Sequence, residues 1–149
     1  MEHLDVETLV NAALDTLYRD SSELIWRDVG ERTICADLAR LLGQSFVGFR
    51  VDCEYNRHGV EIKGVDLPDK NGELVRHSVF PDIIVHQIGH DRDNLIVIEV
   101  KKSTNPVKDD NDLVKLERIK LRMRYKHALF IRLSTGDQYL RERCELKFV

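Results

Sequence analysis

The chain has few of the residues that mark several common classes of protein. Its 149 residues include three cysteines, three prolines and one tryptophan, and aromatic residues make up 7% of the total. Cys35, Cys53 and Cys144 are odd in number and lack Cys-x-x-Cys spacing, which argues against a disulfide framework and against a zinc knuckle. Free thiols fit a reducing compartment, so we expect a cytoplasmic protein.

Long hydrophobic runs are lacking as well. Leu95–Ile98 is typical of the longest runs, whereas a membrane span needs about 18 apolar residues. No N-terminal stretch has the pattern of a secretion signal, and we expect no membrane partner. With 42% hydrophobic and 33% charged residues, the composition is that of a globular chain. The length fits one domain, which we expect to span residues 1–149.

The net charge of −3 conceals an uneven distribution. Residues 1–100 carry 10 Lys and Arg against 19 Asp and Glu, a net charge of −9, and residues 101–149 carry 13 against 7, a net charge of +6. Within residues 115–126 there are six cations and one acid. This pattern suits a protein that holds both a polyanion and a cation, but it also fits a solvated helix face.

Helical periodicity dominates the first third of the chain. Apolar residues recur at helical spacing over residues 6–17, and we assign residues 1–27 to an N-terminal helical extension. A second helix is predicted from about Asp28 to Ser45, with Gly43 marking its end.

From Val47 onward the period changes to 2, which indicates strands. Asp69–Gly72 has the chemistry of a hairpin turn, and Asp109–Asp112 begins a predicted helix that reaches Tyr125. The strands predicted for the core are residues 47–55, 79–86, 95–101 and 127–133, a further short strand is predicted over residues 60–67, and residues 135–149 form a C-terminal segment. We therefore expect an α/β fold, an added N-terminal helix followed by the order αβββαβ, with helices on both faces of a mixed sheet.

Charged residues interrupt two of the most apolar predicted strands. Glu99 and Lys101 alternate with Ile98 and Val100, so they share one face of a strand whose other residues favour burial. Asp82 opens the preceding strand and can meet Glu99 across it. Two adjacent carboxylates repel unless a proton or a cation lies between them, and a hard divalent metal fits such oxygen ligands. An ordinary cross-strand ion pair is the alternative for Glu99 and Lys101.

These residues resemble a known signature. Pro81-Asp82 followed, after sixteen intervening residues, by Glu99-Val100-Lys101 is similar to the motif of the PD-(D/E)XK nuclease superfamily, which includes restriction endonucleases and Holliday junction resolvases. The common core of that superfamily is αβββαβ, so the resemblance implies a restriction-endonuclease-like fold over residues 28–134. It also implies a metal-dependent nuclease, a hydrolase that cleaves DNA phosphodiester bonds with metal-activated water.

The resemblance also implies roles for particular residues. Asp82, Glu99 and the Val100 carbonyl would bind Mg²⁺, for which Mn²⁺ would substitute, and Lys101 would be the catalytic lysine. Many members add a glutamate from the first core helix, and Glu31 is the candidate here. Asp28-Val29-Gly30-Glu31 also reads as a capping box, so a structural role for Glu31 stays open.

Binding of nucleic acid is assigned to the basic residues after the motif, since such contacts to phosphates are electrostatic. They are Lys102, Lys115, Arg118, Lys120, Arg122 and Arg124. We expect DNA as the partner, with RNA not excluded, a homodimer that lets two sites reach both strands, and a protein partner that supplies specificity. The rival interpretation is a catalytically inactive nuclease-fold protein that acts as a nucleic-acid-binding or assembly module.

Overall fold

The computed structural model describes residues 1–53, 65–77, 81–87 and 94–149. These residues form four α-helices, one short 3-10 helix and seven strands. In chain order they are α1 (His3–Asp20), α2 (Ser22–Trp26), α3 (Glu31–Ser45), β1 (Arg50–Cys53), β2 (Val65–Pro68), β3 (Leu74–His77), β4 (Ile83–His86), β5 (Ile96–Lys102), α4 (Asp110–Met123), β6 (His127–Leu133), η3 (Arg141–Arg143) and β7 (Glu145–Phe148).

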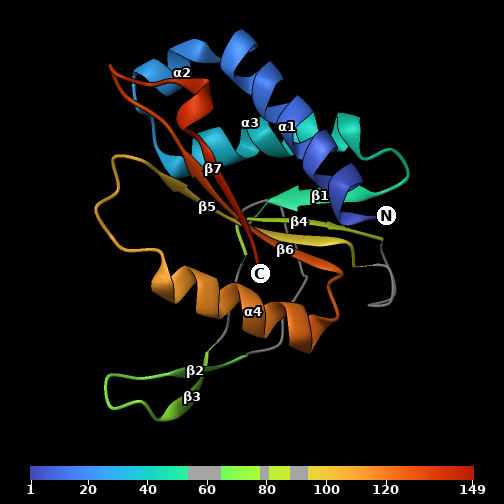
Figure 1. The fold of residues 1–149 in the computed structure, drawn as a ribbon, viewed down its shortest axis with the longest axis vertical. Helices are drawn as coiled ribbons and strands as arrows, with labels where there is room; N and C mark the ends of the chain where they lie inside the picture. Colours follow the sequence, from blue (N-terminus) through green and yellow to red (C-terminus); the bar gives the residue numbers. More distant parts are fainter. Residues whose placement is uncertain (54–64, 78–80, 88–93) are drawn as a thin grey trace.

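Five strands form one mixed sheet in the order β1-β4-β5-β6-β7. β5 and β6 are parallel and are joined through α4, while the other neighbouring strands are antiparallel. The helices α1, α2 and α3 lie on one side of this sheet, and α4 lies on the other (Figure 1). The expectation of an α/β fold with helices on both faces of a mixed sheet is thus confirmed. From α3 to β6, the elements of this sheet and its helices follow the order one helix, three strands, one helix and one strand.

Alternation along β5 divides the core into two parts. Ile98 and Val100 pack with the apolar faces of α1 and α3, which contribute residues such as Leu14 and Leu38. Val97 belongs to a second cluster on the α4 side, together with residues such as Leu116. Because side chains in a strand alternate between faces, Glu99 and Lys101 lie on the α4 side with Val97.

The strands β2 and β3 form a separate two-stranded sheet, which lies beyond α4 in Figure 1. The predicted turn at Asp69–Gly72 is confirmed: Asp69 Oδ1 accepts hydrogen bonds from the backbone N–H of Asn71 at 2.8 Å and of Glu73 at 2.9 Å, and Gly72 has a φ of 80°. Leu67 packs against the apolar cluster under α4. Of the predicted strand 60–67, residues 60–64 lie outside the described residues and residues 65–67 belong to β2, and the periodicity did not show that this strand lies outside the main sheet.

Several predicted boundaries shift. The second long helix begins at Glu31 rather than near Asp28, and it continues through Gly43 to Ser45. The capping box, which was the structural alternative for Glu31, does not form, because Gly30 is the N-cap and no side chain caps the helix. The carboxylate of Asp28 instead pairs with Lys102, Nζ to Oδ1 3.1 Å. Residues 47–49 precede β1, and residues 54 and 55 of the predicted strand 47–55 lie outside the described residues.

The C-terminal half follows the prediction more closely. β6 has the predicted bounds, and α4 ends at Met123, two residues early, because Arg124 adopts a left-handed conformation with φ 56°. The C-terminal segment adds β7, an edge strand antiparallel to β6. None of the helices in the described ranges is long and apolar enough to cross a membrane.

Candidate functional site

Asp82 lies directly before β4, at a point where β5 extends past its neighbour. The last antiparallel pair between these strands is Ile83 with Ile98, so the following residues of β5 have no β4 partner. Asp82 takes that place, and its Oδ2 accepts a hydrogen bond from the Val100 backbone N–H at 2.8 Å. Because the N–H and C=O of an extended residue point to the same side, the Val100 carbonyl faces the edge where Asp82 lies.

Glu99 is the neighbouring carboxylate on β5, and it is almost fully buried, with 7% of its side chain exposed. Burial, with the nearby Asp82 carboxylate as a second cause, raises the pKa of Glu99 to about 8, and the Lys115 ammonium opposes this rise. Burial likewise raises the pKa of Asp82, against the lowering effect of its bond from Val100 N–H. The structure therefore brings together the two carboxylates that the sequence predicted as a pair.

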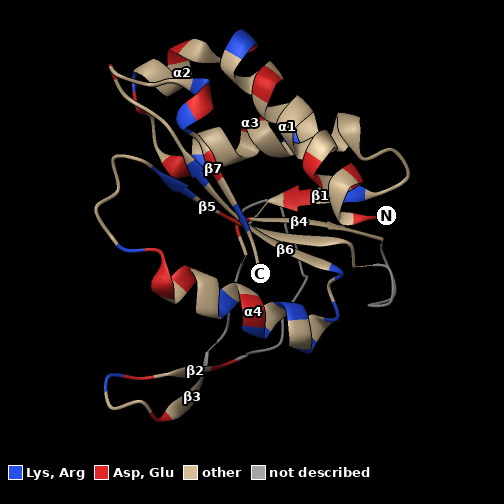
Figure 2. Ribbon diagram, in the orientation of Figure 1, with Lys and Arg blue, Asp and Glu red and all other residues tan. Residues whose placement is uncertain are grey.

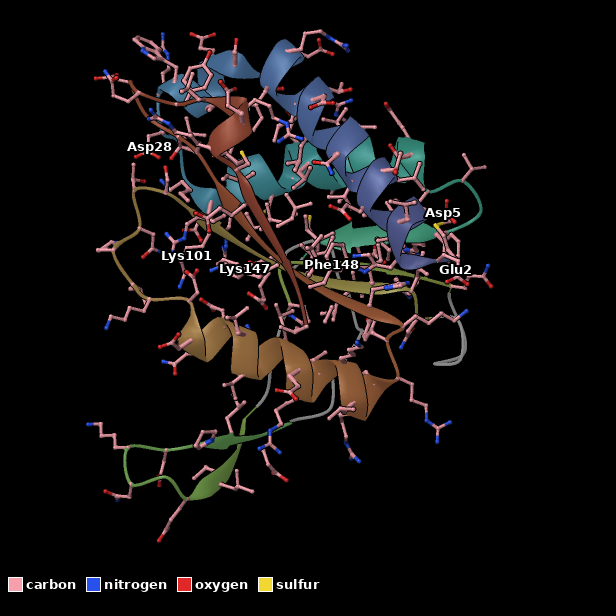
Figure 3. The ribbon with its side chains drawn as sticks, in the orientation of Figure 1. Glu2, Asp5, Asp28, Lys101, Lys147 and Phe148 are labelled. Atoms are coloured by element: carbon pink, nitrogen blue, oxygen red, sulfur yellow. The ribbon has the colours of Figure 1, made fainter. Side chains whose placement is uncertain are left out.

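Two lysines from different elements complete this cluster. Lys115 of α4 places its Nζ 2.8 Å from Glu99 Oε1, although the angle is not that of a hydrogen bond. Lys101 of β5 forms an ion pair with Asp112 of α4 and donates to the backbone carbonyls of Lys108 at 3.2 Å and of Val107 at 3.5 Å. Figure 3 labels Lys101 above the first turn of α4. The lysine in contact with the carboxylate pair is thus Lys115. Lys101, two residues after Glu99 on β5, is bound instead by Asp112 and by two backbone carbonyls.

Glu31 approaches the pair from the first turn of α3. Its Oε2 accepts a hydrogen bond from Asn105 Nδ2 at 3.3 Å, and its charge contributes to the raised pKa of Asp82. Cys35, one turn later, is buried, and burial raises the pKa of its thiol, with Asp82 and Glu31 as further causes. Across the described parts of the chain, no group of three or more His, Cys, Asp and Glu side chains is placed to hold a metal ion. Glu31 is therefore a neighbour of the pair rather than part of a three-carboxylate cluster.

The donor set can nevertheless be compared with the preferences of Mg²⁺. It consists of the buried Glu99 carboxylate, the partly buried Asp82 carboxylate and the Val100 backbone carbonyl, and all of these are hard oxygen donors. Mg²⁺ is bound in enzymes through one or two carboxylates, and it keeps several waters or takes substrate phosphates as further ligands. The residues present thus fit a Mg²⁺ site that substrate completes, and they do not form a closed protein cage.

The residues predicted to contact nucleic acid separate into two groups. Lys102, Lys115 and Lys120 are engaged within the protein: Lys102 pairs with Asp28, Lys115 with Glu99, and Lys120 Nζ donates to the Val149 carbonyl at 2.8 Å. Arg118, Arg122 and Arg124 are exposed, and no ion pair joins them to the residues that the structure describes. Figure 2 shows acidic residues at the start of α4 and basic residues along its second half. The three arginines are therefore the members of the predicted set that are available to a polyanion.

The sequence analysis did not predict the ion pairs between α4 and β5. Asp112 and Lys115 of α4 pair with Lys101 and Glu99 of β5, so the two elements present their charges in opposite order. The sequence carries this signal as Glu-x-Lys followed by Asp-x-x-Lys, spacings that place each pair of charges on one face of a strand and of a helix.

A second buried charge cluster lies on the same face of the sheet. Asp52 of β1 is buried, its Oδ2 lies 2.7 Å from His86 Nε2, and Arg50 Nε lies 2.9 Å from the same oxygen. His86 is in phase with Asp82 but lies at the opposite end of β4, where Asp52 binds it.

Comparison of the chain with protein-family models, with curated proteins and with solved structures finds no match. The function is therefore inferred from the geometry of the carboxylates and lysines.

Proposed function

We propose that the protein is a metal-dependent nuclease that hydrolyses DNA phosphodiester bonds and that its core is restriction-endonuclease-like. The observation that carries the proposal is that Asp82, directly before β4, and the buried Glu99 of the adjacent strand β5 lie together. Burying the Glu99 carboxylate beside a second, partly buried carboxylate is unfavourable, and a bound cation would offset that cost.

In this proposal Asp82, Glu99 and the Val100 carbonyl hold Mg²⁺. When bound, the metal supplies Lewis-acid stabilisation of the developing charge and lowers the pKa of a coordinated water. Other groups of the protein orient these residues. The Val100 backbone N–H holds Asp82, and Asp112 holds Lys101, which lies on the same face of β5 as Glu99. Lys101 then faces the attacking water or the phosphate. The exposed arginines of α4 contact the DNA backbone.

A second candidate function is a catalytically inactive nucleic-acid-binding module of the same fold. The ion pairs of both lysines favour it, because Lys101 is engaged by Asp112 and Lys115 lies against Glu99. This candidate keeps the binding of DNA through α4 but predicts no hydrolysis.

The first test measures the metal site directly, by calorimetric titration of Mn²⁺ and Mg²⁺ into the wild-type protein and into Asp82→Asn. We expect Mn²⁺ binding in the wild type and its loss in the variant, because the variant removes one of two anionic ligands. Nicking of supercoiled plasmid should then fall by about 10²–10⁴-fold in Lys101→Met, the range for losing a positioned acid–base group. Lys70→Met, an exposed change in the hairpin turn, is the matched control and should leave nicking unchanged.

Folded wild-type protein that binds neither ion would refute the nuclease proposal. Metal binding without cleavage of DNA or RNA would favour the inactive module. Cleavage of RNA alone would correct the substrate.

A further inference from the structure

Two ion pairs cross between β5 and α4, and they differ in how firmly each lysine is held. Lys101 has 9% of its side chain exposed, pairs with Asp112 and donates to two backbone carbonyls. Lys115 has 24% of its side chain exposed, and its ion pair is with Glu99. Lys115 is therefore the lysine that can leave its partner at the lower cost.

The position of Lys115 matters because of the oxygen it contacts. Its Nζ lies 2.8 Å from Glu99 Oε1, in the pair of carboxylates assigned above to the metal. An ammonium group and a divalent cation repel each other strongly at such separations in a buried site. A divalent cation bound at Glu99 therefore competes with the ammonium for this carboxylate.

From these contacts we infer that Lys115 is the resident counter-ion of the Asp82–Glu99 pair and that it leaves Glu99 when a divalent cation binds there. The inference rests on the proposed metal site, and it assigns to α4 a residue that neutralises the buried Glu99 beside Asp82 in the metal-free protein. Burying Glu99 next to a second carboxylate would be costly on its own, so Lys115 stabilises the fold until the metal takes over that role.

The first arm of the test compares Mn²⁺ affinities by calorimetry in the wild type, Lys115→Met and Lys70→Met. Lys115→Met keeps the length of the side chain and removes the competing charge, so we expect Mn²⁺ to bind about tenfold tighter or more. Lys70→Met makes the same change of net charge at an exposed site in the hairpin turn, and it should match the wild type. Thermal unfolding completes this arm: Lys115→Met should melt below the wild type in chelator and gain more from saturating Mn²⁺.

The second arm detects the movement of Lys115 rather than its charge. Lysines are acetylated briefly in wild-type protein with chelator or with saturating Mg²⁺, and the modification at each site is read by mass spectrometry. We expect acetylation of Lys115 to rise severalfold with Mg²⁺, because its ammonium is released from Glu99. Lys101 should stay protected, because its contacts with Asp112 and with two carbonyls do not involve the metal ligands.

The possible outcomes separate this inference from the proposed function. If Mn²⁺ binds to the wild type and is lost in Asp82→Asn, but Lys115→Met binds no tighter, the metal site stands and the inference about Lys115 is wrong. It is equally wrong if Mg²⁺ exposes Lys115 and Lys101 together, since that result means that α4 as a whole moves away. If neither the wild type nor Lys115→Met binds metal, the proposed function fails, and Lys115 is a structural counter-ion.

Discussion

The two faces of the central sheet use the same strands but bury different chemistry. On the α1 and α3 side the buried strand residues are hydrocarbon side chains and a thiol, such as Ile98, Leu129 and Cys53. On the α4 side the strands also bury Asp52, Glu99 and Lys101. Asp52 belongs to this face because it lies directly opposite Ile84, which packs under α4.

The two faces therefore differ in how much their buried residues stabilise the fold. A buried ion pair is often no more stabilising than hydrophobic residues of similar volume, because removing charges from water is costly. The α1 and α3 side shows that this chain can cover a face of the sheet with an apolar core. Under the proposed function, Glu99 and Lys101 lie on the opposite face because metal binding and catalysis need their charges.

The largest change in stability is expected from a cavity made on the apolar face. Leu38 of α3 is fully buried, so Leu38→Ala should lower the free energy of unfolding by about 2–5 kcal/mol, which urea denaturation measures. Mn²⁺ affinity should be unchanged, because Leu38 packs in the cluster on the side away from Glu99. A loss of metal binding in folded Leu38→Ala would show that the two faces are not independent.

The charged face should instead respond to pH. Burial, helped by Asp82, raises the pKa of Glu99 to about 8, whereas an unfolded glutamate has a pKa of about 4.3. Between these values the folded protein holds a proton that the unfolded chain releases, so raising the pH favours unfolding. The contribution is complete below the unfolded pKa and is lost as pH rises through about 8.

The matched variant for this effect is Glu99→Gln, which cannot titrate at this position. In chelator, the free energy of unfolding of the wild type should fall relative to the variant between pH 5 and 8, by an amount on the order of a few kcal/mol. Urea denaturation of both proteins at a series of pH values gives this difference. The contributions of the other carboxylates cancel, because both proteins contain them. A difference that stays flat, or that grows in favour of the wild type, would contradict the raised pKa.

Patterns in the sequence predicted the elements of both faces, but not the partners of their charges. The alternation from Val97 to Lys101 predicted which residues of β5 share a face, and the buried clusters confirm it. The same pattern cannot say that Asp112 meets Lys101, because that contact depends on how α4 crosses the sheet. A local signal also left open a capping role for Asp28 that a tertiary contact replaces, because Lys102 pairs with this carboxylate.

The smallest effect is expected from the exposed arginines of α4. Arg118 and Arg122 lie one turn apart on the surface of this helix, and neither has an ion pair in the described ranges. Replacing both with alanine should change stability by no more than about 0.5 kcal/mol, as for most surface substitutions, while weakening the binding of duplex DNA. The slope of log K against log salt concentration should become shallower by about 0.9 for each phosphate that the variant no longer neutralises.

The opposite side of the sheet offers the control for this variant. Arg143 is exposed on η3, a segment that packs against α1, so Arg143→Ala removes a positive charge far from α4 in the fold. Fluorescence anisotropy with a labelled duplex at several salt concentrations measures all three proteins. If Arg143→Ala weakens binding as much per charge removed as the α4 variant, the affinity for DNA depends on the net charge of the protein and not on where the charge lies. If the α4 variant alone lowers the salt slope, the polyanion binds on the side of the sheet that α4 covers and that buries Glu99, so nucleic-acid binding and the proposed metal site share one side of the molecule.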